Sequence, residues 1–360
     1  MDPPPSDPIA ELLTTYNELN SPIITVLDEA PSALEFMRFV SLNRPFIVRG
    51  FASDWEATTT WSLSHLKSTL SSNQVNVAVT PHGNADSPTP NEEGNVVFVK
   101  PWEESQSFPE FVDFVSQQEL RGRKEGEDIL YAQTQNDNLR NEYSSLFSSV
   151  EKDIPFARIA LQQDPDAINL WIGNSYSLTS LHKDPYQNIY VQVLGQKHFT
   201  LLPPLFHPCI NEVPLPSTSY IRSPSDPSTL TIEPDTPPTE LPIATWDPDN
   251  PSVNPTKYSH LAQPMHVTLK PGDMLYLPAL WYHKVGQSCS EEGICVAVNY
   301  WYDMDFGGSF WPLCNFVRNV PKTNPRLRFY PISTCVSYSP NSYVRCVCNA
   351  TPSISQIAIL

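Results

Sequence analysis

Residues 179–199 read "TSLHKDPYQNIYVQVLGQKHF" and place two potential metal ligands, His182 and Asp184, one residue apart. A β-strand presents residues i and i+2 on the same face, so an imidazole nitrogen and a carboxylate oxygen can reach one metal ion from these positions. Triplets of this kind also arise by chance in a chain with eight histidines. The surrounding sequence therefore has to decide whether this is a site.

From about residue 168 the sequence is typical of a β-rich fold. Short runs of β-branched and aromatic residues are separated by Gly, Pro or Asn turns, which predicts a β-sandwich or barrel. These runs are INLWIGN, NIYVQVLG, KHFTLLPP, HVTLKPGDMLYLP and GICVAVNYWYD. One further histidine, His283 in LYLPALWYHKV, follows an apolar strand in the same region.

His182, Asp184 and His283 together would form a set of two histidines and one carboxylate. Such a set binds one face of an octahedral ion and leaves the opposite face open, which suits non-haem Fe(II) better than zinc. His283 taken alone could equally be an ordinary core or surface histidine. Its occurrence in the same β region as the H-x-D triplet favours the metal site.

An Fe(II) site of this type needs a two-electron reductant to activate dioxygen, and 2-oxoglutarate is the common one. One of its carboxylates and the keto oxygen bind the metal, so the far carboxylate needs a buried cation with help from hydroxyl groups. Lys197 lies on the strand that follows a turn at Gly195, and Thr179 and Tyr131 can supply hydroxyls. The alternative for Lys197 is a solvated strand lysine.

The N-terminal half is mixed, and the rest of the chain contains one insertion. We expect helices at 7–19, 61–70, 107–117 and 141–150 and strands at 45–50, 75–81 and 129–135. Residues 203–255 hold 14 prolines, which predicts a long surface loop inside one catalytic domain spanning 1–320. Residues 321–360 show no sustained period and are expected to be an irregular tail.

Composition excludes several classes of protein. The net charge of −17 argues against binding to a nucleic-acid backbone and would favour a basic partner. No apolar run approaches the roughly 20 residues of a membrane span, and the N-terminus lacks a secretory signal. Seven scattered cysteines indicate a reducing compartment rather than a disulfide framework. We therefore expect a cytoplasmic or nuclear location, or both.

Three separated runs carry a resemblance to a known family. NLWIGNSYSLTSLHKDPYQNIYVQVLGQKHFTLLPP, GDMLYLPALWYHKV and VAVNYWYDM occur in this order and resemble the Jumonji-C (JmjC) oxygenases, within them the small group of (3S)-lysyl hydroxylases. The resemblance extends through NRPFIVRG, VNVAVTP and LYAQTQNDNL and covers roughly residues 10–320 apart from the insertion. It implies a double-stranded β-helix, the cupin or jelly-roll fold, with a helical N-terminal region.

The resemblance also implies roles for particular residues. His182, Asp184 and His283 would ligate Fe(II), and Lys197 would pair with the far carboxylate of 2-oxoglutarate, which Thr179 and Tyr131 would also contact. Three further residues would line the cosubstrate pocket, with ordinary strand packing as their alternative role: Asn188, Asn299 and Trp301.

The function implied is Fe(II)- and 2-oxoglutarate-dependent hydroxylation of a lysine in a protein substrate, a developmentally regulated GTP-binding protein. The alternatives are a JmjC histone-lysine demethylase, an endopeptidase that clips basic histone tails, and a cupin-fold binding protein without catalysis. Related hydroxylases dimerise through C-terminal helices, and one sequence run here has helical spacing of apolar residues. We therefore expect a homodimer through Phe310, Leu313, Val317 and Val320.

Overall fold

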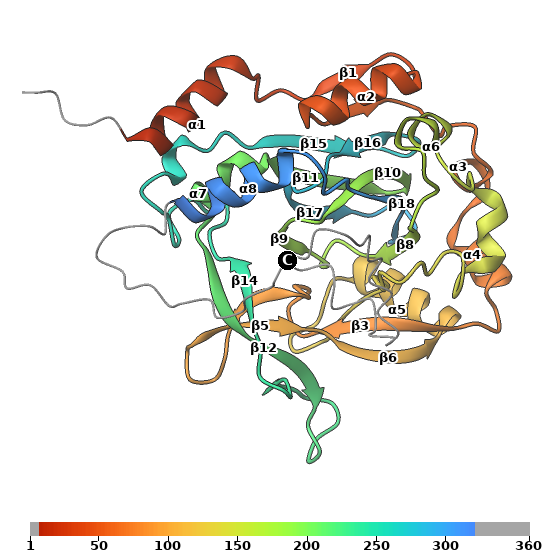
Figure 1. Cartoon of the computed structure of the whole chain (residues 1–360). Helices are drawn as coiled ribbons and strands as arrows, with labels where there is room; N and C mark the ends of the chain where they lie inside the picture. The colour runs from red at the N-terminus through yellow and green to blue at the C-terminus, as the bar shows by residue number, and fades with distance from the viewer. Residues whose placement is uncertain (1–6, 321–360) are drawn as a thin grey trace, which may run out of the picture.

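The computed structural model describes residues 7–320, and its centre is a jelly roll of two facing sheets (Figure 1). The strands are β1 (Thr25–Leu27), β2 (Phe46–Val48), β8 (Ala167–Gly173), β9 (Thr179–His182), β10 (Tyr186–Leu194), β11 (Gln196–Leu202), β15 (Met265–Leu269), β16 (Met274–Leu277), β17 (Tyr282–Ser288) and β18 (Cys295–Asp303). One sheet has the order β1-β2-β16-β10-β18-β8, and the other has the order β15-β11-β17-β9. The predicted β fold is confirmed.

The alternation of side chains along the central strands separates a helix-facing core from an interior cavity. In β10, Ile189 and Val191 belong to the core under the helices, whereas Tyr190 belongs to the core between the two sheets. β18 pairs antiparallel with β10, with Asn299 opposite Tyr190. Because alternate residues share a face, the polar and aromatic residues at the intervening positions point into the jelly roll.

Helices cover the outer face of the six-stranded sheet. They are α2 (Ala33–Leu42), α3 (Glu56–Thr60), α4 (Leu63–Thr69), α5 (Phe108–Arg121) and α6 (Pro155–Leu161). Phe36 of α2 packs edge-on against Tyr276 of β16 with ring centroids 4.8 Å apart. Edge-to-face aromatic pairs of this kind add to the stabilisation from buried apolar area.

The expected N-terminal helix is confirmed as α1 (Pro8–Leu19), and the expected helix at 141–150 is wrong. Asp7 caps α1, because its Oδ1 accepts hydrogen bonds from the backbone N–H groups of Ile9 and Ala10. Residues 141–150 contain only the 3-10 helix η1 (Ser144–Ser149), which is rich in serine. Serine side chains compete for backbone hydrogen bonds and so do not favour a regular helix.

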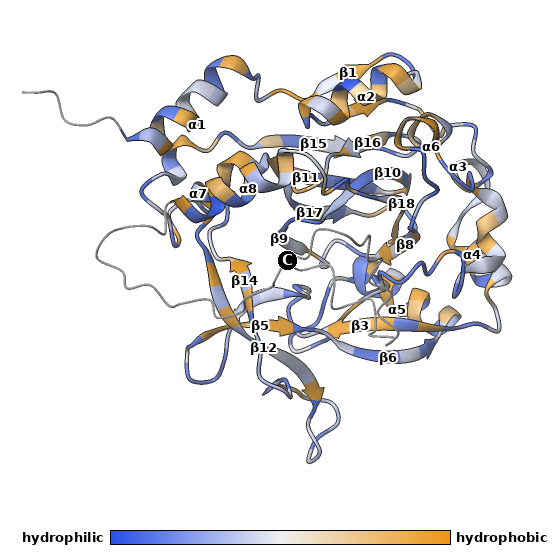
Figure 2. Ribbon diagram, in the orientation of Figure 1, coloured by the Kyte–Doolittle hydropathy of each residue, from blue (hydrophilic) through white to orange (hydrophobic). Residues whose placement is uncertain are grey.

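A second β layer lies below the jelly roll in Figure 1. One sheet has the order β6-β3-β7, and a second sheet has the order β13-β12-β5-β4, with β14 paired to β12. The bounds are β3 (Gln74–Thr80), β4 (Ser87–Pro90), β5 (Val96–Lys100), β6 (Trp102–Ser107), β7 (Ile129–Tyr131), β12 (Glu212–Arg222), β13 (Leu230–Pro234) and β14 (Glu240–Ala244). Figure 2 shows β5 mostly orange and β6 blue to white, as expected for an apolar strand and a polar edge strand.

The proline-rich segment 203–255 is therefore not the surface loop that its composition predicts. It supplies η2 (Pro204–Phe206), α7 (His207–Ile210) and the strands β12, β13 and β14. Pro214 of β12 stands opposite Pro242 of β14, so two of the missing backbone donors fall on the same rung of the ladder. Around Pro214, β12 pairs with β14 alone among the described strands, and prolines disrupt such an edge pair less than a strand that is paired on both sides.

The short helix η3 (Ser259–Leu261) precedes β15, and α8 (Phe310–Asn319) is the last described element. Helix α8 packs beside α7 (Figure 1). The helix expected at the end of the domain is thus present. The predicted irregular tail at 321–360 lies outside the described residues. Within residues 7–320, no helix is long and apolar enough to cross a membrane.

Candidate metal and cosubstrate site

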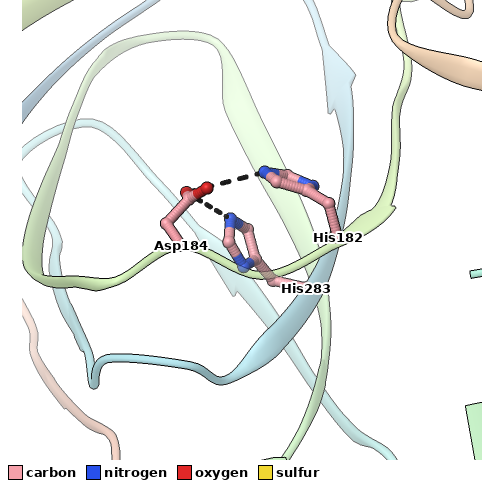
Figure 3. A group of neighbouring side chains, drawn as sticks. All are labelled: His182, Asp184 and His283. Carbon is pink, nitrogen blue, oxygen red and sulfur yellow. Dashed lines mark ion pairs between the residues drawn. The ribbon is translucent and has the colours of Figure 1, made fainter. Parts of the chain in front are cut away.

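The three proposed metal ligands come together at the edge of the four-stranded sheet (Figure 3). His182 Nε2 and His283 Nε2 each lie 3.6 Å from the same oxygen of Asp184, Oδ2. This separation is too long for a hydrogen bond and suits donor atoms that surround one cation. The expected strand geometry is modified, because β9 ends at His182 and Asp184 follows two residues later in a loop.

Backbone carbonyls orient both imidazole rings. His182 Nδ1 lies 2.8 Å from the carbonyl oxygen of Ser180, and His283 Nδ1 lies 3.0 Å from that of Trp281. A carbonyl only accepts, so each Nδ1 carries the proton and donates it. Each Nε2 is then left with its lone pair toward Asp184, which is the form of histidine that binds a metal.

The charges in this group also suit a cation. Burial and the neighbouring His182 together lower the pKa of His283 to about 4, so His283 is neutral at physiological pH. Burial opposes ionisation of Asp184, but the combined effects of His182, His283 and Lys183 outweigh it and lower the pKa of Asp184. The pKa of His182 is raised. Burial lowers it, but the combined effect of Asp184 and of the contact with the Ser180 carbonyl is stronger.

Lys197 is not the solvated strand lysine of the alternative interpretation. It is 2% exposed, and its Nζ donates a hydrogen bond to the hydroxyl of Tyr131 at 2.9 Å. Among residues 7–320, no carboxylate lies within ion-pair distance of it. A buried ammonium group without a counter-charge costs several kcal/mol, so this position fits an anionic ligand such as the far carboxylate of 2-oxoglutarate.

A small cavity of about 30 Å³ lies behind the triad and collects the other predicted residues. Its lining includes Tyr131, Thr179, Asn188, Asn299 and Trp301. Asn299 donates to Asn188 Oδ1 at 3.1 Å and accepts from the indole N–H of a neighbouring tryptophan at 2.9 Å. The two amides are thus mutually fixed at the cavity wall, where they and the hydroxyls of Tyr131 and Thr179 offer polar groups among apolar side chains.

Trp301 has a packing partner as well as a place in that lining. Its ring stacks on Tyr186, with centroids 4.6 Å apart and an interplanar angle of 4°. Trp301 therefore both lines the small cavity and packs against a neighbouring aromatic ring.

A second, much larger cavity of about 860 Å³ opens on the other side of the triad. His182, Asp184, Thr179 and Gln135 line both cavities, so the metal ligands stand at their junction. The large cavity lies between the jelly roll and the second β layer, and β12 and β14 of the insertion form part of its wall. An ion at the triad would therefore face the small cavity on one side and a space of substrate size on the other.

The sequence interpretation missed two residues that line the large cavity, Lys183 and Asp86. Lys183, between two of the ligands, contacts Glu212 at 2.6 Å and the hydroxyl of Tyr282 at 3.2 Å. Asp86 lines the large cavity from the loop between β3 and β4. The position of Lys183 inside the H-x-D triplet was a usable signal, whereas Asp86 lies in an irregular stretch without any periodic pattern.

Comparison with known proteins agrees with this architecture. The model of the cupin-like domain family matches residues 31–308. The chain is 36% identical over 301 residues to the human "Bifunctional peptidase and (3S)-lysyl hydroxylase JMJD7". The aligned region covers 83% of this chain and 90% of the relative. It is 37% identical to "Lysine-specific demethylase JMJ32" of Arabidopsis thaliana, over 78% of this chain and 81% of the relative.

A third relative extends the comparison beyond animals and plants. "JmjC domain-containing protein E" of Dictyostelium discoideum is 34% identical, over 78% of this chain and 84% of the relative. The family match covers most of the chain, and the shared jelly roll carries the two histidines and the carboxylate that the family needs for its metal. The chain therefore belongs to the cupin-like JmjC family of 2-oxoglutarate oxygenases.

Proposed function

We propose that this protein is an Fe(II)- and 2-oxoglutarate-dependent protein hydroxylase that acts on a lysine, at its C-3 carbon, in a GTP-binding protein. The observation that carries the proposal is the triad at the junction of a small cavity and a large one. This arrangement gives a dicarboxylate and a protein side chain separate approaches to one metal ion. Fe(II) with 2-oxoglutarate supplies oxidising chemistry from dioxygen, and succinate and carbon dioxide are the coproducts.

The residues of the chain have separate tasks in this scheme. His182, Asp184 and His283 hold the ion through two neutral nitrogens and one carboxylate oxygen. Lys197 and Tyr131 bind the far carboxylate of 2-oxoglutarate by charge and hydrogen bond. The remaining wall includes Thr179, Asn188, Asn299 and Trp301, which orient the cosubstrate and keep water away from it.

The choice of a lysine and of a GTP-binding protein rests on similarity to the human relative named as a (3S)-lysyl hydroxylase. The net charge of −17 suits a basic partner. We further propose a cytoplasmic or nuclear location, and a homodimer formed through α8, where Leu313 and Phe316 are 58% and 64% exposed. Val317, which we expected at that interface, is instead buried within the subunit.

Mass spectrometry tests the reaction type. The protein is incubated with a developmentally regulated GTP-binding protein, Fe(II), 2-oxoglutarate and oxygen, and succinate is measured in parallel. We expect one added oxygen atom on one lysine, with matching succinate. Loss of a methyl group from a methyl-lysine peptide, without oxygen retained on any GTPase lysine, would indicate a demethylase. Peptide-bond cleavage without succinate would indicate a peptidase.

A further inference from the structure

The large cavity has an uneven distribution of charge. Two lysines line it, and both contact acids: Lys100 lies 2.8 Å from Asp235, and Lys183 lies 2.6 Å from Glu212. Asp184 belongs to the metal triad. The charges that remain on the wall are those of two carboxylates, Asp86 and Glu103.

Asp86 is the more enclosed of these two carboxylates, because Glu103 is exposed. The amide of Gln133 donates to Asp86 Oδ2 at 3.1 Å. Among residues 7–320, no donor is hydrogen-bonded to Oδ1 and no cation pairs with the group. Burial raises the pKa of Asp86 to about 6 against the opposing effect of the Gln133 hydrogen bond. The carboxylate is therefore held in place by Gln133, and within the described residues it has no ion-pair partner.

The loop that carries Asp86 is fixed against the segment that leads into β9. Gly83 has φ +74°, and a Cβ there would lie 1.9 Å from the carbonyl oxygen of Tyr176. The carbonyl of Gly83 accepts from the backbone N–H of Leu178 at 2.8 Å. Asp86 is near enough to His182 for each charge to affect the pKa of the other. The carboxylate thus has a defined position on the substrate side of the metal ligands.

We propose that Asp86, positioned by Gln133, receives the cationic head of the substrate side chain, and that this head is an ammonium group. One carboxylate oxygen is engaged by Gln133, which leaves a single oxygen for the ligand. A compact ammonium ion can use one oxygen, whereas a guanidinium group binds a carboxylate best through both. This inference rests on the proposed function and adds a substrate-binding residue and a preference for lysine over arginine.

Binding without turnover tests this inference separately from the reaction. The full-length protein is loaded with Fe(II) and 2-oxoglutarate under nitrogen and titrated by calorimetry or NMR with N-acetyl amides of lysine, arginine and norleucine. The wild type should bind the lysine amide at least tenfold more tightly than the norleucine amide and more tightly than the arginine amide. Asp86→Asn should lose that preference, and the matched variant Glu103→Gln should keep it.

Asp86→Ser provides a second variant in case Asp86→Asn does not fold, and thermal melting with metal binding checks the integrity of each protein. A wild type without preference for the lysine amide would overturn the inference. So would an Asp86 variant that folds and keeps the preference, or a wild type that favours the arginine amide. This experiment measures binding without turnover. Its result therefore stands even if the mass-spectrometric test finds no hydroxylation.

Discussion

His182 and His283 are direct cross-strand partners of β9 and β17, with ring centroids 4.1 Å apart. The pairing of these two strands brings together histidines that are far apart in the sequence. The carboxylate of Asp184, in the loop after β9, then lies within reach of both Nε2 atoms. Sheet register, rather than local sequence, completes the metal site.

The first prediction concerns the metal. His283→Ala removes one of three ligand atoms, so Fe(II) retained after desalting and succinate formation should both fall below detection while the fold persists. Metal analysis and a succinate assay measure the two effects. His198→Ala is the matched control, since His198 lies on β11 and is bonded to Thr268 and Ser288 instead. Undiminished turnover in His283→Ala would disprove the triad, and His182→Ala and Asp184→Ala should behave like His283→Ala.

The second prediction concerns the cosubstrate. Lys197→Ala should leave the far carboxylate of 2-oxoglutarate unpaired in a buried site and weaken its binding by about 2–5 kcal/mol. Tyr131→Phe removes one hydroxyl and keeps the ammonium group, so it should cost only about 1 kcal/mol. The KM for 2-oxoglutarate and the Fe(II) affinity are measured for both variants. Equal cosubstrate affinity in Lys197→Ala and the wild type would refute the role of Lys197.

The third prediction concerns a buried ionic group around Glu212, whose side chain is 1% exposed. Its carboxylate lies 2.6 Å from Lys183 Nζ and 2.5 Å from Arg318, so it ties α8 to the loop between the metal ligands. Glu212→Gln removes the charge that both cations contact. Breaking a buried ion pair in this way should lower the free energy of unfolding by about 3–5 kcal/mol at pH 7.

The same variant should change the dependence of stability on pH. Burial opposes ionisation of Glu212, but His207 and Lys183 outweigh it and hold its pKa well below the usual value. A lowered pKa stabilises the folded state above the unfolded pKa of about 4.3 and loses that effect as the pH falls below it. The stability gap between the wild type and Glu212→Gln should therefore shrink below about pH 4.3. Denaturant titrations at several pH values measure it, with exposed Glu240→Gln as control; a gap independent of pH would contradict this account.

The fourth prediction concerns assembly. Leu313 and Phe316 of α8 are largely exposed apolar side chains, and burial in a dimer would remove that surface from water. The wild type should be a dimer at micromolar concentration by light scattering. Leu313→Glu and Phe316→Glu should both be monomers. A monomeric wild type would reject the dimer.

The sequence predicted the parts of the site that local pattern can reveal. The H-x-D triplet, the strand periodicity around it and the lysine after Gly195 pointed to a candidate ligand set and a cation. Alternation explains only part of this, because Asp184 follows β9 in a loop and Lys197 lies on another strand, β11. Helix α2 also had a readable signal, the Ser32–Glu35 capping box, which the sequence interpretation did not use.

Other features depend on tertiary contacts. The insertion looked irregular because its prolines hide the strand pattern, yet β12 pairs with β5 from the distant N-terminal half and walls the large cavity. Asp86 lies in a turn-rich stretch, and its significance comes from the absence of an ion-pair partner among the described residues and from the cavity that it lines. Neither property can be seen before the fold brings these segments together.

Incubation under ¹⁸O₂ tests the central claim most directly. The protein, Fe(II), 2-oxoglutarate and a candidate GTP-binding protein are combined in unlabelled water, and the substrate peptides are analysed by mass spectrometry. We predict one ¹⁸O atom on a lysine of the substrate for each succinate formed, and no label when His283→Ala replaces the wild type. An unlabelled product, or a modified substrate formed without succinate, would contradict the assignment as a 2-oxoglutarate-dependent hydroxylase.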